Sequence, residues 1–251
     1  MLLPIGDEPN DPRHTAWMNY ALIGANVLVF VLSAFQPRAQ FEQFLMDWAY
    51  NPRDPTVVTL VSSTFVHASF LHIFGNMLFL WIFGDNIEAR LGPWLHLGVY
   101  LLLGCFANLI HGLFADAPVV GASGAVSGIQ GMYFVACGRH RVRMLFWFYF
   151  FITVLHVNAR IVMGFWFIMQ DVIPTIANLR VNVTDQVAHM AHLGGFAVGL
   201  VAMLVLRRLL RRIARADARE WANAGAPTGS LPGAEERRSL RGPYADDDFA
   251  P

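Results

Sequence analysis

Long stretches of the chain are rich in apolar residues and contain no charged side chain. Five windows are free of Asp, Glu, Lys and Arg, at residues 14–37, 55–84, 91–115, 117–138 and 186–206. Each window is at least 21 residues long, and about 20 apolar residues suffice to cross a bilayer as a helix. The pattern therefore predicts a polytopic membrane protein.

Six transmembrane helices are expected, because the stretch 144–179 needs one further crossing if the polar sites on either side of it share a membrane face. This fifth helix is expected at 158–172, with Pro174 helping to end it. An aromatic piece at 145–157 is expected at the membrane interface. The fold class is therefore predicted as all-α, a bundle of six transmembrane helices. The other five helices are expected at 17–35, 70–87, 94–114, 121–137 and 187–206.

The composition supports this assignment. Hydrophobic residues make up 55% of the chain and charged residues 14%, whereas a soluble domain carries about 25% charged residues. A soluble enzyme, a nucleic-acid-binding protein and a disulfide-stapled secreted domain are therefore excluded. Cys105 and Cys137 lie in apolar segments and are expected to be small core residues.

The arginines orient the bundle. All 18 basic residues are Arg, and most of them flank the side that holds both chain ends in a six-helix topology. The positive-inside rule places that side in the cytoplasm. The predicted organisation is a cytoplasmic segment (1–15), a six-helix domain (16–206), an Arg-rich cytoplasmic helical extension (207–221) and a flexible tail (222–251).

Several polar side chains lie inside the predicted helices. His72 and Asn76 share one face of the second helix, Ser123 begins the fourth, and His189 and His192 begin the sixth. All lie within about two turns of the start of an even-numbered helix, hence near the outer membrane face. Because intramembrane polar groups usually face the bundle interior or a water-filled cavity, they predict a water-accessible pocket between three helices.

Small residues favour close packing of the fourth and sixth helices. Gly124 and Gly128 share a face of the fourth helix, and Gly195 and Gly199 share a face of the sixth with His192. Such faces allow two helix backbones to approach closely. The packing would bring a serine on one helix within reach of an imidazole on the other.

This combination permits nucleophilic acyl transfer. Ser123 would be the nucleophile and His192 its general base. The first-turn N–H groups of the fourth helix, which have no intrahelical partner, would stabilise an oxyanion together with His72 and Asn76. No acidic residue lies in these three helices near the pocket, so a Ser–His dyad is expected, with Asp185 as a candidate third member. Other residues expected to line the substrate pocket are Gly121, Gly124, Ser127 and His189.

Three motifs occur in an order that is typical of one family. They are TFVHASFLHIFGNMLFLWIFGDNIEARLG at 64–92, GASGAVSG at 121–128 and AHLGGFAVGL at 191–200. With these motifs the chain resembles the rhomboid family of intramembrane serine proteases, of the prokaryotic type, over roughly residues 15–206.

The resemblance implies a six-helix bundle in which Ser123 is the nucleophile and His192 the base. His72, Asn76 and the Ser123 amide would form the oxyanion site, and Gly128, Gly195 and Gly199 would pack the helices. Helix 5 and the loop over the site would gate substrate entry. Ser127 stands where some members carry an aromatic that packs on the catalytic histidine. Glu88 and Arg90 match a structural motif of the inner loop.

The implied activity is hydrolysis of a peptide bond in or near the transmembrane helix of a membrane-protein substrate. Neither a metal nor a cofactor is expected. The expected partners are transmembrane proteins and the lipid bilayer, with no nucleic acid. The expected location is a bacterial cytoplasmic membrane, with the active site opening to the extracytoplasmic side.

Other functions remain open at this point. A catalytically inactive rhomboid-like protein could bind transmembrane clients through the same helices. A zinc protease could use His72, His189 and His192, although the chain has no H-E-x-x-H motif. A proton-coupled transporter would use the histidines but has no acidic residue at the membrane centre. The remaining histidines, including His67, are expected in loops or at interfaces.

Overall fold

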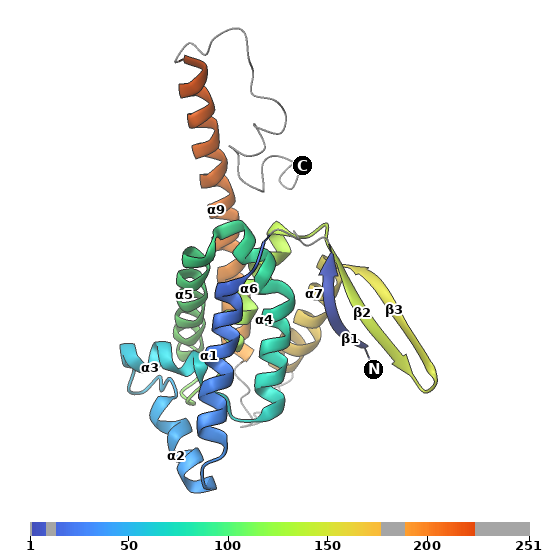
Figure 1. Cartoon of the computed structure of the whole chain (residues 1–251). Helices are drawn as coiled ribbons and strands as arrows, with labels where there is room; N and C mark the ends of the chain where they lie inside the picture. Colours follow the sequence, from blue (N-terminus) through green and yellow to red (C-terminus); the bar gives the residue numbers. More distant parts are fainter. Residues whose placement is uncertain (1, 9–13, 177–188, 224–251) are drawn as a thin grey trace.

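The computed structural model describes residues 2–8, 14–176 and 189–223. Most of these residues are helical, and three strands form a small sheet at one side (Figure 1). The elements in chain order are β1 (Leu2–Glu8), α1 (Trp17–Ala34), α2 (Arg38–Trp48), α3 (Val57–Ser62), η1 (Ser63–Phe65), α4 (Phe70–Leu91), α5 (Pro93–Gly112), α6 (Ser123–Ala136), β2 (Arg141–Phe148), β3 (Phe151–Asn158), α7 (Ala159–Phe167), η2 (Ile168–Val172) and α9 (His189–Asn223).

Four of the described helices are long and apolar enough to cross a membrane. They comprise α1, α4, α5 and the part of α9 from His189 to Leu209. Large apolar side chains such as Leu28, Leu32 and Val201 are exposed on their outer faces, as expected for a surface in contact with lipid rather than water. The chain is therefore an integral membrane protein.

The shorter helix α6 is the centre of the bundle. Its 14 residues span about 21 Å at 1.5 Å per residue, and ten of them are buried. Helices α4, α5 and α9 all pack on it, and Figure 1 shows α6 enclosed between them. Its small residues allow this close packing on several sides, since bulkier side chains would push the neighbouring helices apart.

Hydrogen bonds from α4 hold the N-terminus of α1. The carboxylate of Glu88 accepts from the backbone N–H groups of Asn19 at 2.7 Å and Met18 at 3.3 Å, and Glu88 is fully buried. It thereby satisfies two first-turn amides that have no partner within their own helix. Arg90 donates to the carbonyl of Asn86 in the same helix. These contacts give Glu88 and Arg90 a structural role at this end of α4.

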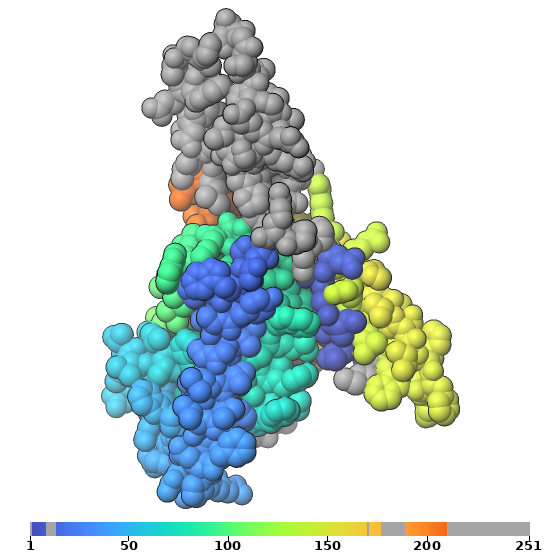
Figure 2. All heavy atoms as spheres, viewed as in Figure 1, coloured from blue at the N-terminus to red at the C-terminus, as the bar shows by residue number. Residues whose placement is uncertain are grey.

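The predicted all-α fold is confirmed only in part: the structure is mostly helical, but residues 141–158 form a β-hairpin that the prediction did not include. Strand β2 pairs antiparallel with both β1 and β3. Its alternating side chains explain the difference: Val142 and Met144 are buried against the bundle, whereas Arg141 is exposed. The hairpin projects from the side of the bundle in Figure 2. The side chains of its aromatic turn are exposed, and Phe150 is fully exposed.

The fifth predicted helix corresponds to α7 and η2. Helix α7 begins at Ala159, where the Asn158 side chain caps its first turn, and η2 continues it as a π-helix. Pro174 does not end the helix, because residues 173–176 are α-helical again. Helix α9 runs without a break from His189 to Asn223. The predicted domain boundaries, at 15/16, 206/207 and 221/222, stay predictions.

Candidate active site

Ser123 is the first residue of α6 and follows a loop that is held from both sides. The N–H of Gly121 donates to the carbonyl of Ser63 at 2.8 Å. The N–H of Ala122 donates to Nε2 of His67 at 3.3 Å. These two bonds fix the backbone before Ser123, whose side chain is half-buried. Ser123 is therefore held in a defined place at the helix start. Its hydroxyl lies next to first-turn amides that have no intrahelical partner.

Gly121 brings this loop against His72. Its φ of +124° lies in the region that favours glycine. A methyl group at this position would lie 2.6 Å from Cε1 and 2.7 Å from Nε2 of His72, and 3.7 Å from the Ser123 hydroxyl. Only a glycine leaves room for the imidazole here. The structure thus places Ser123 and His72 around one point of the backbone.

Asn76 lies one turn beyond His72 on α4. The residue is 7% exposed, and its Nδ2 has no hydrogen-bond partner among the described residues. A buried amide without a partner costs about 1–3 kcal/mol. The His72 ring also contacts the His67 ring edge-on, with 5.1 Å between the centroids. Polar groups that could donate hydrogen bonds are therefore gathered at the start of α4.

Helices α6 and α9 touch backbone to backbone. Gly195 faces the backbone of Gly124, and Gly199 faces the backbone of Gly128, so closely that a methyl group on either α9 glycine would overlap the facing carbonyl. Ser127 is buried on the same helix, α6. Since Gly124 follows Ser123 and Gly195 is one turn from His192, this contact brings the two helix starts together.

His192, the predicted base, is paired with an aspartate and not with Ser123, the predicted nucleophile. Nδ1 of His192 lies 2.7 Å from Oδ1 of Asp171, which belongs to η2. His192 is also close enough to His72 to interact with it electrostatically. Among the described residues, Ser123 and His192 share no hydrogen bond. Catalytic hydrogen bonds are often long without substrate and tighten when it binds.

A family model decides the assignment. The model of the Rhomboid domain matches residues 54–209, which is more than half of the chain. The chain belongs to the rhomboid family. The match covers every residue assigned to the candidate site, from His72 on α4 to Gly199 on α9.

Curated rhomboid-like proteins also resemble the chain. RHOMBOID-like protein 12, mitochondrial, from Arabidopsis thaliana is 29% identical over 74% of this chain and 57% of its own length. Rhomboid protein 1, mitochondrial, from Saccharomyces cerevisiae is 31% identical over 48% of this chain and 36% of its own length. The human Presenilin-associated rhomboid-like protein, mitochondrial, is 29% identical over 71% of this chain and 45% of its own length.

The coverage and the names of these relatives limit what can be transferred to this chain. In each of the three alignments the chain spans less than two thirds of the relative's length. The named organisms are eukaryotes and the names place the proteins in mitochondria, so the comparisons do not support the expected bacterial cytoplasmic membrane.

Sequence reasoning missed two residues of this rhomboid site. His67 was expected in a loop or at an interface, yet it is 1% exposed and binds the loop before the serine. Asp171 was overlooked in favour of Asp185, which lies outside the described residues. The available signals were the proximity of His67 to the H-x-x-x-N motif and the single acidic residue in the predicted fifth helix.

Three side chains, those of His192 (the predicted general base) and two neighbours, could hold a metal ion. One ligand atom from each of Asp171, His189 and His192 lies within 4.8 Å of the others. His72, which the zinc alternative required, is not part of this group. A tetrahedral zinc ion holds its ligand atoms about 2.0–2.2 Å away and hence about 3.4 Å from one another, and the Asp171–His192 pair is closer than that. The 2.7 Å separation of Asp171 and His192 is instead that of a direct hydrogen bond.

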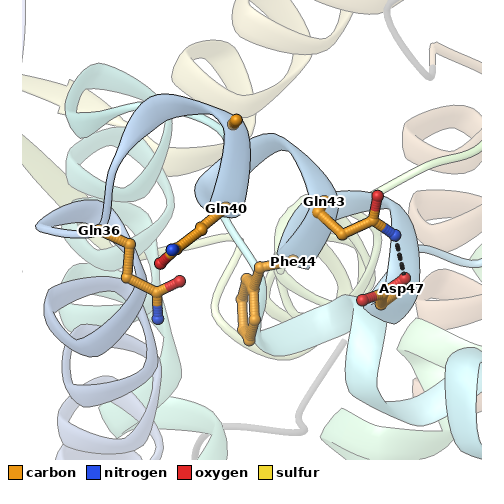
Figure 3. A pocket seen from close by; sticks show the side chains of 6 residues that line it. Gln36, Gln40, Gln43, Phe44 and Asp47 are labelled. Atoms are coloured by element: carbon orange, nitrogen blue, oxygen red, sulfur yellow. Dashed lines mark hydrogen bonds between the residues drawn. The ribbon is translucent and has the colours of Figure 1, made fainter.

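A surface hollow on α2 is separate from this site. It is lined by Gln36, Ala39, Gln40, Gln43, Phe44 and Asp47 (Figure 3). The Gln43 amide donates to Asp47 one turn further along α2 at 2.6 Å. None of the lining residues belongs to the candidate site, and the hollow has no nucleophile paired with a base.

Proposed function

We propose that this rhomboid is an intramembrane serine endopeptidase. The observation that carries the proposal is the placement of Ser123 at the start of α6, between His72 on α4 and the His192 helix α9. A hydroxyl, an imidazole and free helix amides are the three parts that acyl transfer requires.

In the proposed reaction, His192 accepts the Ser123 proton as the hydroxyl oxygen attacks the carbonyl carbon of the scissile peptide. The tetrahedral intermediate collapses when His192 returns that proton to the leaving amine, which leaves an acyl-serine. Water, activated by His192, then attacks the ester and releases the acid and the free serine. Atoms and charges balance without a metal or cofactor.

The oxyanion would form beside α4. Asn76 Nδ2 is a buried donor without a partner among the described residues, and the His72 ring lies against Gly121. Together with the Ser123 amide they can donate to the developing negative charge, and one such donor is typically worth about 10²- to 10³-fold in rate. Gly121, Gly124, Ser127 and His189 would line the space for the substrate.

The proposed topology has six crossings with both termini in the cytoplasm. The four long helices would cross together with α6 and with α7 plus η2. The arginines favour the cytoplasmic side for the end of α9, so the starts of α4, α6 and α9 would face the opposite, outer side. The site would open there, with α7 as the gate.

The proposed substrates are other membrane proteins. A transmembrane helix hides its peptide carbonyls in hydrogen bonds, so a segment must unwind locally before Ser123 can attack one. Helix-weakening residues such as Gly and Pro near the scissile bond are therefore expected. The rival function is a non-catalytic protein that binds such helices, and the presence of both Ser123 and His192 argues against it.

The test is cleavage of a model transmembrane substrate by protein reconstituted in liposomes. Wild type should cleave it and be labelled covalently by a fluorophosphonate, whereas Ser123→Ala and His192→Ala should lose at least about 10³-fold in rate. Ser33→Ala on α1 and His156→Ala on β3 are the matched controls and should cleave normally. Equal cleavage by all five proteins, or no cleavage and no labelling of wild type, would refute the proposal.

A further inference from the structure

The imidazole of His192 is hydrogen-bonded to a carboxylate from a different helix. The 2.7 Å between Nδ1 of His192 and Oδ1 of Asp171 is typical of a charge-assisted hydrogen bond. The Asp171 side chain is 10% exposed and that of His192 is 20% exposed. A carboxylate at membrane depth is costly unless it is paired. The pairing therefore explains how an aspartate is tolerated at this position.

Local backbone structure directs Asp171 toward α9. Asp171 lies in η2, a π-helix, and such turns occur frequently at functional sites. Pro174 follows, and in a regular α-helix its ring would clash with the carbonyl of residue 170. A π-turn pairs residues five apart rather than four, so the side chains of η2 are spaced differently around the helix axis than in an α-helix.

An aromatic contact fixes this segment on α9. The ring of Phe167, the last residue of α7, stacks on Phe196 with 4.3 Å between centroids and 27° between planes. Phe196 lies one turn beyond His192. The carboxylate and the imidazole are therefore held together by backbone geometry and by packing next to them.

We propose that Asp171 is the positioning residue of the catalytic base, so that the site operates as a Ser123–His192–Asp171 triad. The inference rests on the proposed protease function. Asp171 would accept the Nδ1–H of His192 and hold the neutral ring in the tautomer whose Nε2 is free to accept the serine proton. It would also stabilise the imidazolium that forms when Ser123 attacks.

The attack of Ser123 involves the transfer of one proton. The proton from Ser123 moves to Nε2 of His192, and the Nδ1 proton stays on the ring throughout. The carboxylate of Asp171 stays ionised and touches neither the substrate nor the reacting atoms. Its effect is on the orientation and charge of His192.

Two other roles for Asp171 make different predictions. A purely structural ion pair would hold η2 on α9, so its loss would lower stability without a specific effect on turnover. A metal ligand, acting with His189 and His192, would make turnover depend on a bound ion. A positioning residue affects turnover and the His192 tautomer, and it does so without metal.

The isosteric substitution Asp171→Asn separates these roles. In soluble serine proteases the equivalent change lowers kcat by about 10⁴-fold through the wrong tautomer. Here we expect kcat to fall by about 10²- to 10⁴-fold while KM changes by less than about threefold and the melting temperature stays close to that of wild type. The matched control is Asp116→Asn, an exposed aspartate paired with Arg53, which should keep wild-type kinetics.

The tautomer is measured directly on wild type, so the test does not depend on a variant that folds. Nitrogen-15 NMR of histidine-labelled protein, with His192→Gln to assign the resonance, should show neutral His192 protonated at Nδ1. Asp171→Asn should shift the population to the Nε2–H form. A wild-type ring protonated at Nε2, or normal turnover by Asp171→Asn, would overturn the triad.

Three further outcomes are informative. Loss of wild-type activity and a change of the His192 resonance on chelation would overturn the triad in favour of a metal site. If wild type cleaves substrate and is labelled by the fluorophosphonate while Asp171→Asn turns over normally, the triad fails and the protease function stands. If wild type neither cleaves nor is labelled, both fail.

Discussion

A single methyl group on α9 should separate the nucleophile from the base. In Gly195→Ala the new carbon would lie 3.1 Å from the carbonyl carbon of Gly124 and 3.4 Å from its Cα, and it would overlap the carbonyl oxygen. Carbon atoms in good contact are about 3.5–4.0 Å apart. The obstacle is backbone, which cannot rotate away as a side chain can.

The size of the effect follows from this geometry. To relieve the overlap, α9 must move away from α6 by about 1 Å, an estimate based on ordinary contact distances. Gly124 is adjacent to Ser123 and Gly195 is one turn from His192, so the shift acts directly between the reacting groups. A misplacement of about 1 Å costs about 10²-fold in rate, and overpacking costs about 1–3 kcal/mol of stability.

The assay compares Gly195→Ala with Gly98→Ala in the same liposomes. No heavy atom lies within 4 Å of a methyl group placed on Gly98 of α5. That control should cleave normally and gain about 0.4–1 kcal/mol of stability. We expect Gly195→Ala to lose about 10²-fold in kcat/KM and to be labelled more slowly by a fluorophosphonate, with the folded fraction measured by thermal unfolding. Wild-type kinetics in folded Gly195→Ala would refute the reasoning, because the glycine contact would then not set the distance between the helices.

Three further predictions concern stability, pH and metal. Burial lowers the pKa of His67 to about 3, below its usual 6.5. Stability should therefore fall as the pH drops below about 6.5, by up to about 1.4 kcal/mol per pH unit. His67→Gln should show a weaker loss in melting scans between pH 7 and pH 5, and a loss equal to that of wild type would contradict this. Glu88→Ala should lower the melting temperature by several degrees, since two buried amides lose their acceptor at about 1–3 kcal/mol each, whereas exposed Glu42→Ala should not; equal melting temperatures would refute the role of Glu88. Chelators should leave cleavage unchanged because no proposed step needs a metal, and a chelator-sensitive rate would contradict the serine mechanism.

The sequence predicted the helices well because charge and apolar length act locally. The predicted helix starts lie within two residues of the starts of α1, α4, α5, α6 and α9, although α9 continues to Asn223. The glycine pattern also pointed to the α6–α9 contact, since a G-x-x-x-G face depends only on helical periodicity. Both signals can be recognised without knowing which helices are neighbours.

The sheet was missed because two patterns compete in the same residues. The aromatic run from Phe146 is typical of a membrane interface, and it dominated the alternation of charged and apolar residues that starts at Arg141. That alternation has the two-residue period of a strand. Strand β1 pairs with β2, with Leu2 opposite Phe146. Nothing local in the sequence signals a pairing partner so far along the chain.

Asp171 was missed for a different reason. An ideal helix with 3.6 residues per turn fixes the direction of each side chain, but the π-turn in η2 changes that direction after Phe167. Sequence spacing therefore could not aim Asp171 at His192. The sequence predicts that Pro174 helps to end the helix. In the structure Pro174 follows the π-turn, and the helix continues through residue 176.

The two halves of the proposed site are held by different parts of the fold. Ser123 begins the buried central helix, and its loop is bonded to Ser63 and His67. His192 begins α9 and is held by a carboxylate from η2, beside the short helix α7. A substrate that displaces α7 at its proposed gate would therefore act on the base through Asp171, while the nucleophile stays fixed. A movement of the α9 start would then move the base relative to the nucleophile, which places control of the proposed reaction on the histidine side of the site.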